Sequence, residues 1–189
     1  MTHFEYISVA IALVNALVVS RLLRGITASL RPDAFYFTHF AWLVTLILIT
    51  VMQWWSMWGA REVEWTALKF IWILGLPSIL FLRSGVLLSE HPEEIESFEN
   101  YFFESRIAFF SLGLLTSFWV SVTPWILGIF PWFTITQLHM GSSVLMGLSI
   151  VGLISKGRLI HTILALLFMV AALLNFFTFS FEVHAAIAK

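Results

Sequence analysis

The hydrophobic residues of this chain fall into six long runs, and short polar segments separate the runs. A helix needs about 20 residues to cross an apolar bilayer core about 30 Å thick, and each run comes near that length. The runs cover residues 6–23, 37–58, 65–88, 103–124, 133–154 and 159–181. The pattern predicts an all-α, polytopic transmembrane helix bundle of six spans, which forms a single transmembrane domain over residues 1–189.

Composition supports the same fold class. Hydrophobic residues make up 60% of the 189 residues and charged residues only 11%, which excludes a water-soluble fold, since soluble domains carry about 25% charged residues. This composition indicates the lipid bilayer as partner, and the formal net charge of -1 indicates no nucleic-acid partner. Cysteine is absent, so no disulfide or thiolate metal site is possible. The first run has neither a basic leader nor a small-residue cleavage site, and we expect it to be a retained helix.

Lysine and arginine are distributed unevenly between the two sets of connections. Seven of the ten flank the first, third and fifth connections: Arg21, Arg24, Arg31, Arg83, Arg106, Lys156 and Arg158. Short basic segments stay on the cytoplasmic side of a membrane, so both termini are predicted to lie outside. Tryptophans gather near the opposite ends of spans two to five, as expected for a belt in the outer headgroup layer.

The third connection carries a helix-start signal. Pro92 is followed at once by Glu93 and Glu94, and acids favour the positive end of a helix dipole. Hydrophobic residues then recur at helical spacing through Phe102. We therefore expect an amphipathic cytoplasmic extension of span four over residues 92–102. Its acidic face is predicted to be solvated, and a docking surface for a partner is the alternative.

Polar side chains within the spans are the candidates for function, because each is costly in hydrocarbon and tends to face the bundle interior or a wet cavity. The candidates for lining a pathway are Asn15, His39, Gln53, Arg83, Glu104, Arg106, His139 and His161. Two interpretations apply to the charged members. Either Glu104 pairs with Arg83 or Arg106 while the other arginines reach headgroups, or these residues line a polar vestibule open to the cytoplasm. His139, about two turns below the outer surface, either bonds a neighbouring helix or carries protons.

Motifs for catalysis are absent. The sequence contains no zinc-protease, nucleophile-elbow, Walker or dinucleotide-binding pattern, so no enzyme activity, catalytic residue or metal site is predicted. No cofactor is predicted either. Haem is the one alternative, since His39 and His161 lie at matching depth and haem iron accepts axial imidazoles.

Several short motifs carry a resemblance to a known family. They are Phe4-Glu5, His39-Phe40-Ala41-Trp42, Gln53-Trp54-Trp55, Arg61-Glu62-Val63-Glu64-Trp65-Thr66 with Pro77, Tyr101-Phe102 with Arg106 and Phe109-Phe110, and Arg158 with His161. With them the chain resembles a family of small six-span bacterial inner-membrane proteins without an assigned activity. The resemblance covers spans one to four and the start of span six. It implies a multi-pass location in the bacterial inner (plasma) membrane, and neither a substrate nor a catalytic residue.

Three functions are compatible with these observations. The first, which the buried ionisable groups favour, is an ion channel or small-solute transporter lined by the candidate residues, alone or as a homo-oligomer. The second is a haem-binding redox subunit. The third is a non-catalytic subunit that stabilises a membrane complex through faces of small residues. Those faces comprise Ser8, Ala12, Ala16 and Ser20 in span one, Gly113, Ser117 and Ser121 in span four, and Ser143 and Gly147 in span five.

Overall fold

The computed structural model describes residues 2–187, with side chains through Leu174, and this part of the chain contains helices and no strand. The helices are α1 His3–Ser29, α2 Phe37–Ser56, α3 Ala67–Leu87, α4 Phe98–Leu127, α5 Gln137–Ile154 and α6 Arg158–Ile187. Two short 3-10 helices, η1 Met57–Ala60 and η2 Pro92–Glu94, lie in the second and third connections. The predicted all-α class and the number of long helices are confirmed.

The helices are those of an integral membrane protein. Five segments are long and apolar enough to cross a membrane: His3–Ser29, Phe37–Ala60, Ala67–Glu94, Phe98–Leu127 and Gln137–Ile154. The stretch Arg158–Leu174, the part of α6 described with side chains, is also apolar. Many large hydrophobic side chains point outward on these helices, as expected where lipid replaces water as the surrounding solvent.

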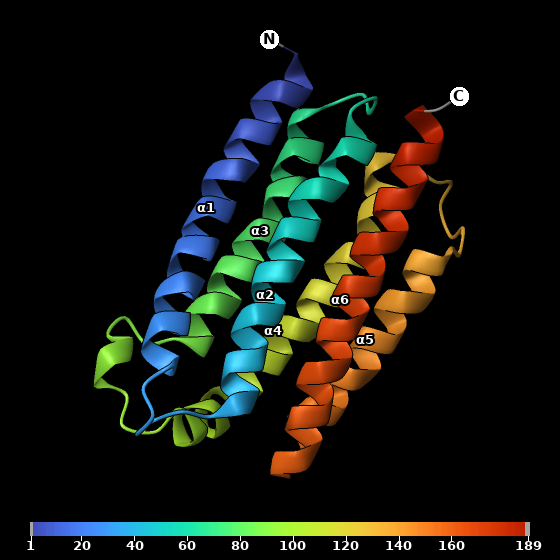
Figure 1. Ribbon diagram of the computed structural model, residues 1–189. Coiled ribbons are helices and arrows are strands. Elements are labelled where there is room, and N and C mark those ends of the chain that lie inside the picture. The colour runs from blue at the N-terminus through green and yellow to red at the C-terminus, as the bar shows by residue number, and fades with distance from the viewer. Residues whose placement is uncertain (1, 188–189) are drawn as a thin grey trace.

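The helices α1 to α6 alternate in direction along the chain and form one bundle (Figure 1). Helices α3 and α4 pack against each other, α1 and α5 flank them, and α2 and α6 pack together across the bundle. The start of α1 and the end of α6 lie at the same end of the molecule, which we call the terminal end (Figure 1). We call the opposite end the basic end, because Arg21, Arg24, Arg31, Lys156 and Arg158 lie there.

Trp42 on α2 is the centre of the largest buried core. Its indole is fully buried, and its ring contacts Phe109 and Phe110 of α4 at centroid distances of 4.9 and 5.5 Å. Phe168 of α6 lies 5.1 Å away on another side. Aromatic pairs at these separations add about 0.5–1.5 kcal/mol each beyond area burial. This aromatic core fixes the spacing of α2, α4 and α6.

Two tryptophans hold α3 against α4 nearer the terminal end. The rings of Trp72 and Trp119 stack at 4.0 Å, and Trp119 Nε1 donates to the Trp72 carbonyl at 3.1 Å. Trp72 Nε1 in turn donates to Thr123 Oγ1 at 3.0 Å. Gly75 makes this approach possible, since a Cβ there would lie 2.2 Å from the Trp119 ring. The contact is therefore both stacked and hydrogen-bonded.

The expected amphipathic helix over residues 92–102 differs from the structure. Pro92 starts the 3-10 helix η2, and α4 begins only at Phe98, where the Ser97 side chain accepts from the backbone N–H of Asn100. Arg31, from the first connection, donates to the carbonyl of Glu93 at 2.6 Å and also to that of Ile95. Ile95 and Ser97 are extended, with ψ of 115° and 110°, so the helix that starts at Pro92 ends before α4 begins. Arg31 binds the carbonyls on either side of Glu94 in this segment.

Candidate functional site

Asn15 and Gln53 form a bridge between α1 and α2. Asn15 Nδ2 donates to Gln53 Oε1 at 2.8 Å, and both side chains are buried. Asn15 Oδ1 has no hydrogen-bond partner among the described residues. These two sequence candidates are brought together, and their direct contact joins two helices.

His39 is a junction of four helices. Its Nε2 lies 2.8 Å from the Leu87 carbonyl, which only accepts, so Nε2 carries a proton and donates. Nδ1 lies 3.2 Å from Ser29 Oγ, and the Phe98 ring packs against the imidazole at 4.6 Å. Both ring nitrogens of His39 are therefore occupied by contacts within the bundle.

His161 and Arg106 converge on one backbone oxygen. His161 Nε2 and Arg106 Nε lie 3.0 and 3.3 Å from the carbonyl of Ser155, which ends α5. The rings of Phe102, Phe103 and Phe110 enclose the imidazole at 5.3–5.4 Å. The polar contact thus ties α4, α5 and α6 together at the basic end.

A bis-histidine haem does not fit this arrangement. His39 uses both nitrogens within the bundle, and the face of its ring is covered by Phe98. His161 uses Nε2 for Ser155 and is enclosed by three phenyl rings. A macrocycle between the two histidines would have to displace these rings and break the hydrogen bonds of His39.

His139 caps its own helix. Its Nδ1 accepts from the Thr136 backbone N–H at 3.1 Å and lies 2.8 Å from Thr136 Oγ1, while the ring stacks on Trp125 at 4.6 Å. Because α5 begins at Gln137, His139 lies in the first turn and not two turns inside. The sequence placed it too deep because the hydrophobic run starts at Phe133, before the helix does.

Glu104 does not pair with Arg83 or Arg106. Its side chain is exposed on the outer face of α4, whereas Arg106 is buried, and no ion pair among the described residues joins Glu104 to either arginine. At the basic end, Glu99 pairs with Arg158 and Glu93 with His91. A hydrogen bond from its own backbone N–H, and then His91, hold the pKa of the Glu93 carboxyl below its usual value.

Arg83 is the one charged side chain in the described residues that is buried almost completely. Only 1% of it is exposed, and its Nε and Nη2 atoms meet no hydrogen-bond acceptor there. Its Cζ lies 4.3 Å from the centre of the Phe109 ring, 5.5 Å from that of Trp42 and 6.0 Å from that of Phe168. Aromatic faces offer the cation partial compensation only, about 0.5–2 kcal/mol per contact.

The Arg83 guanidinium points toward the middle of the bundle and not toward the headgroup layer at its basic end. A Cβ added at Gly113 would lie 3.1 Å from Arg83 Nη2 and 3.2 Å from Ser149 Oγ. Gly113 follows the first residue of α4, Phe98, by fifteen positions, or about 22 Å of helix. Side chains of α3 lean toward its N-terminus, which is at the terminal end. Snorkelling to the basic end therefore does not account for Arg83.

Two phenylalanines separate this buried cation from the polar pair at the basic end. Arg106, Phe109, Phe110 and Gly113 follow one another on the inward face of α4 at helical spacing, and all are buried. The Phe110 ring packs so closely on α5 that a Cβ at Gly152 would lie 2.4 Å from it. In this structure the space between Arg106 and Arg83 is thus filled by aromatic rings.

Comparison with known proteins gives no match, whether with family models, curated proteins or solved structures. Sequence reasoning identified Arg83 but missed its surroundings: Trp42, Phe109, Ser149 and Phe168 were not candidates, and Gly113 was expected only as a packing residue. The helical spacing from Arg106 to Gly113 was a signal for Phe109 and Gly113 on α4, whereas the other three lie on α2, α5 and α6 and had none.

Proposed function

We propose that this protein is a channel or carrier for a small anion in the bacterial inner membrane, and that Arg83 is its anion-binding residue. One observation carries the proposal: a buried guanidinium whose Nε and Nη2 atoms have no acceptor among the described residues. On insertion scales an arginine at the centre of a span costs about 2.5–3.5 kcal/mol. A charge kept at that cost without an internal counter-ion indicates an external one.

The free atoms of Arg83 define the ligand class. Nε and Nη2 form one edge of the planar guanidinium, and this edge donates two parallel hydrogen bonds to an oxyanion. The rings of Trp42, Phe109 and Phe168 exclude water and lower the local dielectric, which strengthens the attraction. Closely packed rings leave room for a small ligand only. Nitrate, a halide or a short carboxylate has the appropriate size and charge.

The charges at the basic end support entry of the anion from that end of the bundle. Its cluster of arginines raises the local anion concentration at that face. Arg106 and His161 lie between that face and the two phenylalanines that cover Arg83. An anion entering there would pass Arg106 and displace Phe109 or Phe110 before it reached Arg83. On this proposal the structure shows the closed conformation, in which the two phenylalanine rings block the route to Arg83.

A second candidate function is that of a subunit in a homo-oligomer or a larger membrane complex. Gly113 and Ser117 of α4 are buried within the chain and Ser121 is half-buried, but Ala16, Ser20, Ser143 and Gly147 are exposed. An added Cβ at Gly141 or Gly147 would meet nothing within 4 Å. Small exposed residues on a membrane helix permit close approach of another helix, which favours this second candidate.

Anion-dependent stability tests the first proposal directly. A ligand that binds the folded state raises its melting temperature, so the purified protein should melt higher in nitrate or chloride than in gluconate at equal ionic strength. Arg83→Met should abolish this difference and also raise the melting temperature in gluconate, because it removes an uncompensated buried charge. Arg83→Lys, which keeps the charge but not the bidentate edge, should retain part of the effect.

Flux measurements complete the test. Proteoliposomes should release nitrate faster than protein-free vesicles, and Arg83→Met should abolish the excess, whereas Lys156→Gln, a cation lost from an exposed position, should not. Equal melting in nitrate and gluconate, together with flux no greater than in empty vesicles, would refute the proposal. A loss of stability in Arg83→Met would show that the arginine has a structural role instead.

A further inference from the structure

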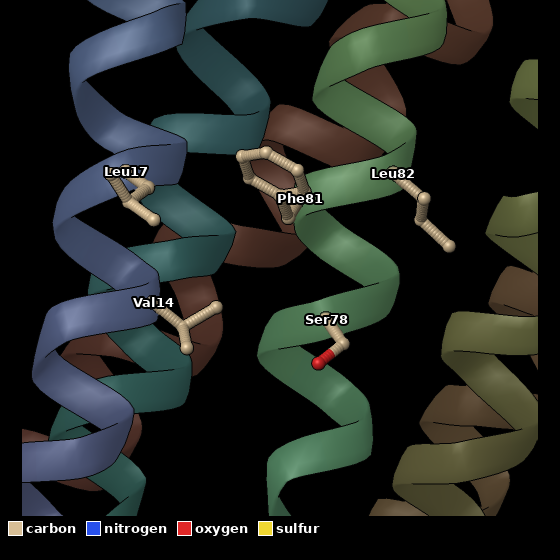
Figure 2. A pocket seen from close by; sticks show the side chains of 5 residues that line it. All are labelled: Val14, Leu17, Ser78, Phe81 and Leu82. Carbon is tan, nitrogen blue, oxygen red and sulfur yellow. The ribbon is translucent and has the colours of Figure 1, made fainter.

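The seam between α1 and α3 carries two hollows on the outer face of the bundle. The first holds about 240 Å³ and is lined by Val14, Leu17, Ser78, Phe81 and Leu82 (Figure 2). Four of these five side chains are apolar, and the hydroxyl of Ser78 is bonded to its own helix at the Leu74 carbonyl. This hollow therefore presents a hydrocarbon surface, at a depth where lipid chains surround the protein.

The second hollow lies at the basic end of the same seam. It holds about 470 Å³ and is lined by Arg21, Arg24, Gly85, Leu88, Ser89, Glu90 and His91. Two arginines and a histidine face one carboxylate, so the lining is more basic than acidic at neutral pH. It lies at the predicted cytoplasmic headgroup layer, because α1 and α3 both end there.

Arg21 is held in position at the junction of the two hollows. Its guanidinium lies over the Phe81 ring at 4.3 Å, and Nη1 is 3.5 Å from the Phe81 carbonyl. Gly85 gives it room, since a Cβ there would lie 2.6 Å from Nη1. Only one of its nitrogen atoms is bonded to protein in the described part of the chain, so the remaining donors are available to a ligand.

The two hollows adjoin each other along the α1–α3 seam, and we call them together the groove. Val14, Leu17, Arg21 and Arg24 follow one another along a single face of α1 at helical spacing. The facing residues of α3 run from Ser78 past Phe81 to Gly85. Phe81 lines the apolar hollow, and its ring also contacts the guanidinium of Arg21. This contact joins the apolar hollow to the basic one. An apolar trough that ends in two arginines matches a molecule with a hydrocarbon tail and an anionic head.

The geometry points to a binding site for an anionic phospholipid of the phosphatidylglycerol type. One acyl chain lies in the hollow of Val14, Leu17 and Phe81, and the phosphodiester accepts hydrogen bonds from Arg21 and Arg24. The carboxylate of Glu90 accepts from a headgroup hydroxyl, which phosphatidylglycerol supplies and phosphatidic acid lacks. The groove lies on the outer α1–α3 seam, while Arg83 points to α4 and α5, so this site is separate from the proposed anion site.

Native mass spectrometry of the purified protein tests the site. Titration with phosphatidylglycerol should give one adduct that phosphatidylcholine of the same chain length does not give. Each arginine near an anionic headgroup contributes about 1 kcal/mol, so Arg21→Gln with Arg24→Gln should weaken the adduct roughly thirty-fold. Lys156→Gln is the matched control, since it removes a cation at the basic end outside the groove, and it should leave the adduct unchanged.

A second variant tests the hydrocarbon part without changing charge. Ser78→Phe places a ring in the apolar hollow at an exposed position, and it should reduce adduct formation several-fold while leaving the melting temperature without lipid unchanged. Equal loss in Lys156→Gln and the double variant would overturn the proposal, as would full adduct formation in Ser78→Phe. Displacement of the lipid by an equal concentration of glycerol 3-phosphate would also overturn it, because the site would then bind free phosphate groups.

Discussion

The guanidinium of Arg83 on α3 lies against the bare backbone of Gly113 on α4. An added Cβ at Gly113 would come within 3.1 Å of Arg83 Nη2, which is tighter than ordinary van der Waals contact. The absence of a side chain on α4 thus gives a buried cation its place in the middle of the bundle. Each residue destabilises the folded protein, Arg83 because its charge is desolvated and Gly113 because glycine disfavours a helix. The proposed anion site explains why the two occur together.

Gly113→Ala should weaken both the fold and the anion effect. The methyl group would press on Arg83 and on Ser149 Oγ at 3.2 Å, and overpacking of this kind costs about 1–3 kcal/mol. We expect a lower melting temperature and a smaller nitrate-dependent shift. Gly147→Ala on α5 is the matched control, because nothing lies within 4 Å of its added Cβ. Equal effects in the two variants would contradict a specific contact at Gly113.

The buried pair of Asn15 and Gln53 should show measurable coupling. Asn15→Leu leaves Gln53 Oε1 without its donor at 2.8 Å, and Gln53→Leu has the reverse effect on Asn15. In a double-mutant cycle on unfolding in detergent, we expect a coupling energy of about 0.6–1.7 kcal/mol, the range for side-chain hydrogen bonds between membrane helices. Strictly additive effects would show that the contact does not stabilise the bundle.

Phe110→Ala should open the route from the basic end to Arg83. The ring packs on Trp42 at 5.5 Å and on His161 at 5.4 Å, so its removal leaves a cavity between His161 and Trp42, whose ring lies near Arg83. We expect faster nitrate flux in proteoliposomes and a loss of about 3–5 kcal/mol in stability, as for other buried phenylalanines. Phe118→Ala is the control, because that ring is exposed on the same helix. Unchanged flux in a folded Phe110→Ala protein would place the route elsewhere.

Arg31→Lys should loosen the third connection while leaving the bundle intact. The guanidinium reaches two carbonyls in that connection, those of Glu93 and Ile95, and a single ammonium group cannot reproduce this fork. Hydrogen exchange should become faster at the backbone amides of residues 92–98 and stay unchanged in α2. Protection equal to that of the parent protein would mean that packing of Ile95 against Ala34 holds the connection by itself.

The helices could be predicted from the sequence because each hydrophobic run is a local signal. Partnerships between side chains were harder to predict, since they depend on how each helix is rotated. Glu104 and Arg106 are two positions apart and therefore point in directions about 200° apart on a helix. Only one of them can face the interior, and Arg106 shares its face with Phe109, Phe110 and Gly113. The pairing of Glu104 with a buried arginine was wrong for that reason.

The start of α4 could not be predicted because the competing interaction comes from far along the chain. The Pro92-Glu93-Glu94 signal is genuine, and it produces the 3-10 helix η2. The helix ends at Ile95, which is extended, and the segment that follows is held by Arg31, more than sixty residues away, and by the Ser97 cap. No local pattern contains that information. The same holds for His39, whose partners Ser29 and Leu87 belong to two other helices.

The convergence of Arg106 and His161 on the Ser155 carbonyl joins the end of α5 to α4 and α6 at the basic end. His39 makes a second junction there, since its hydrogen bonds join α1, α2 and α3 and its ring contacts Phe98 of α4. The stacked Trp72 and Trp119 join α3 to α4 near the terminal end, and the contact of 2.7 Å between Thr38 and Thr162 joins α2 to α6 near the basic end. A substitution at the Ser155 or the His39 junction therefore perturbs at least three helices at once.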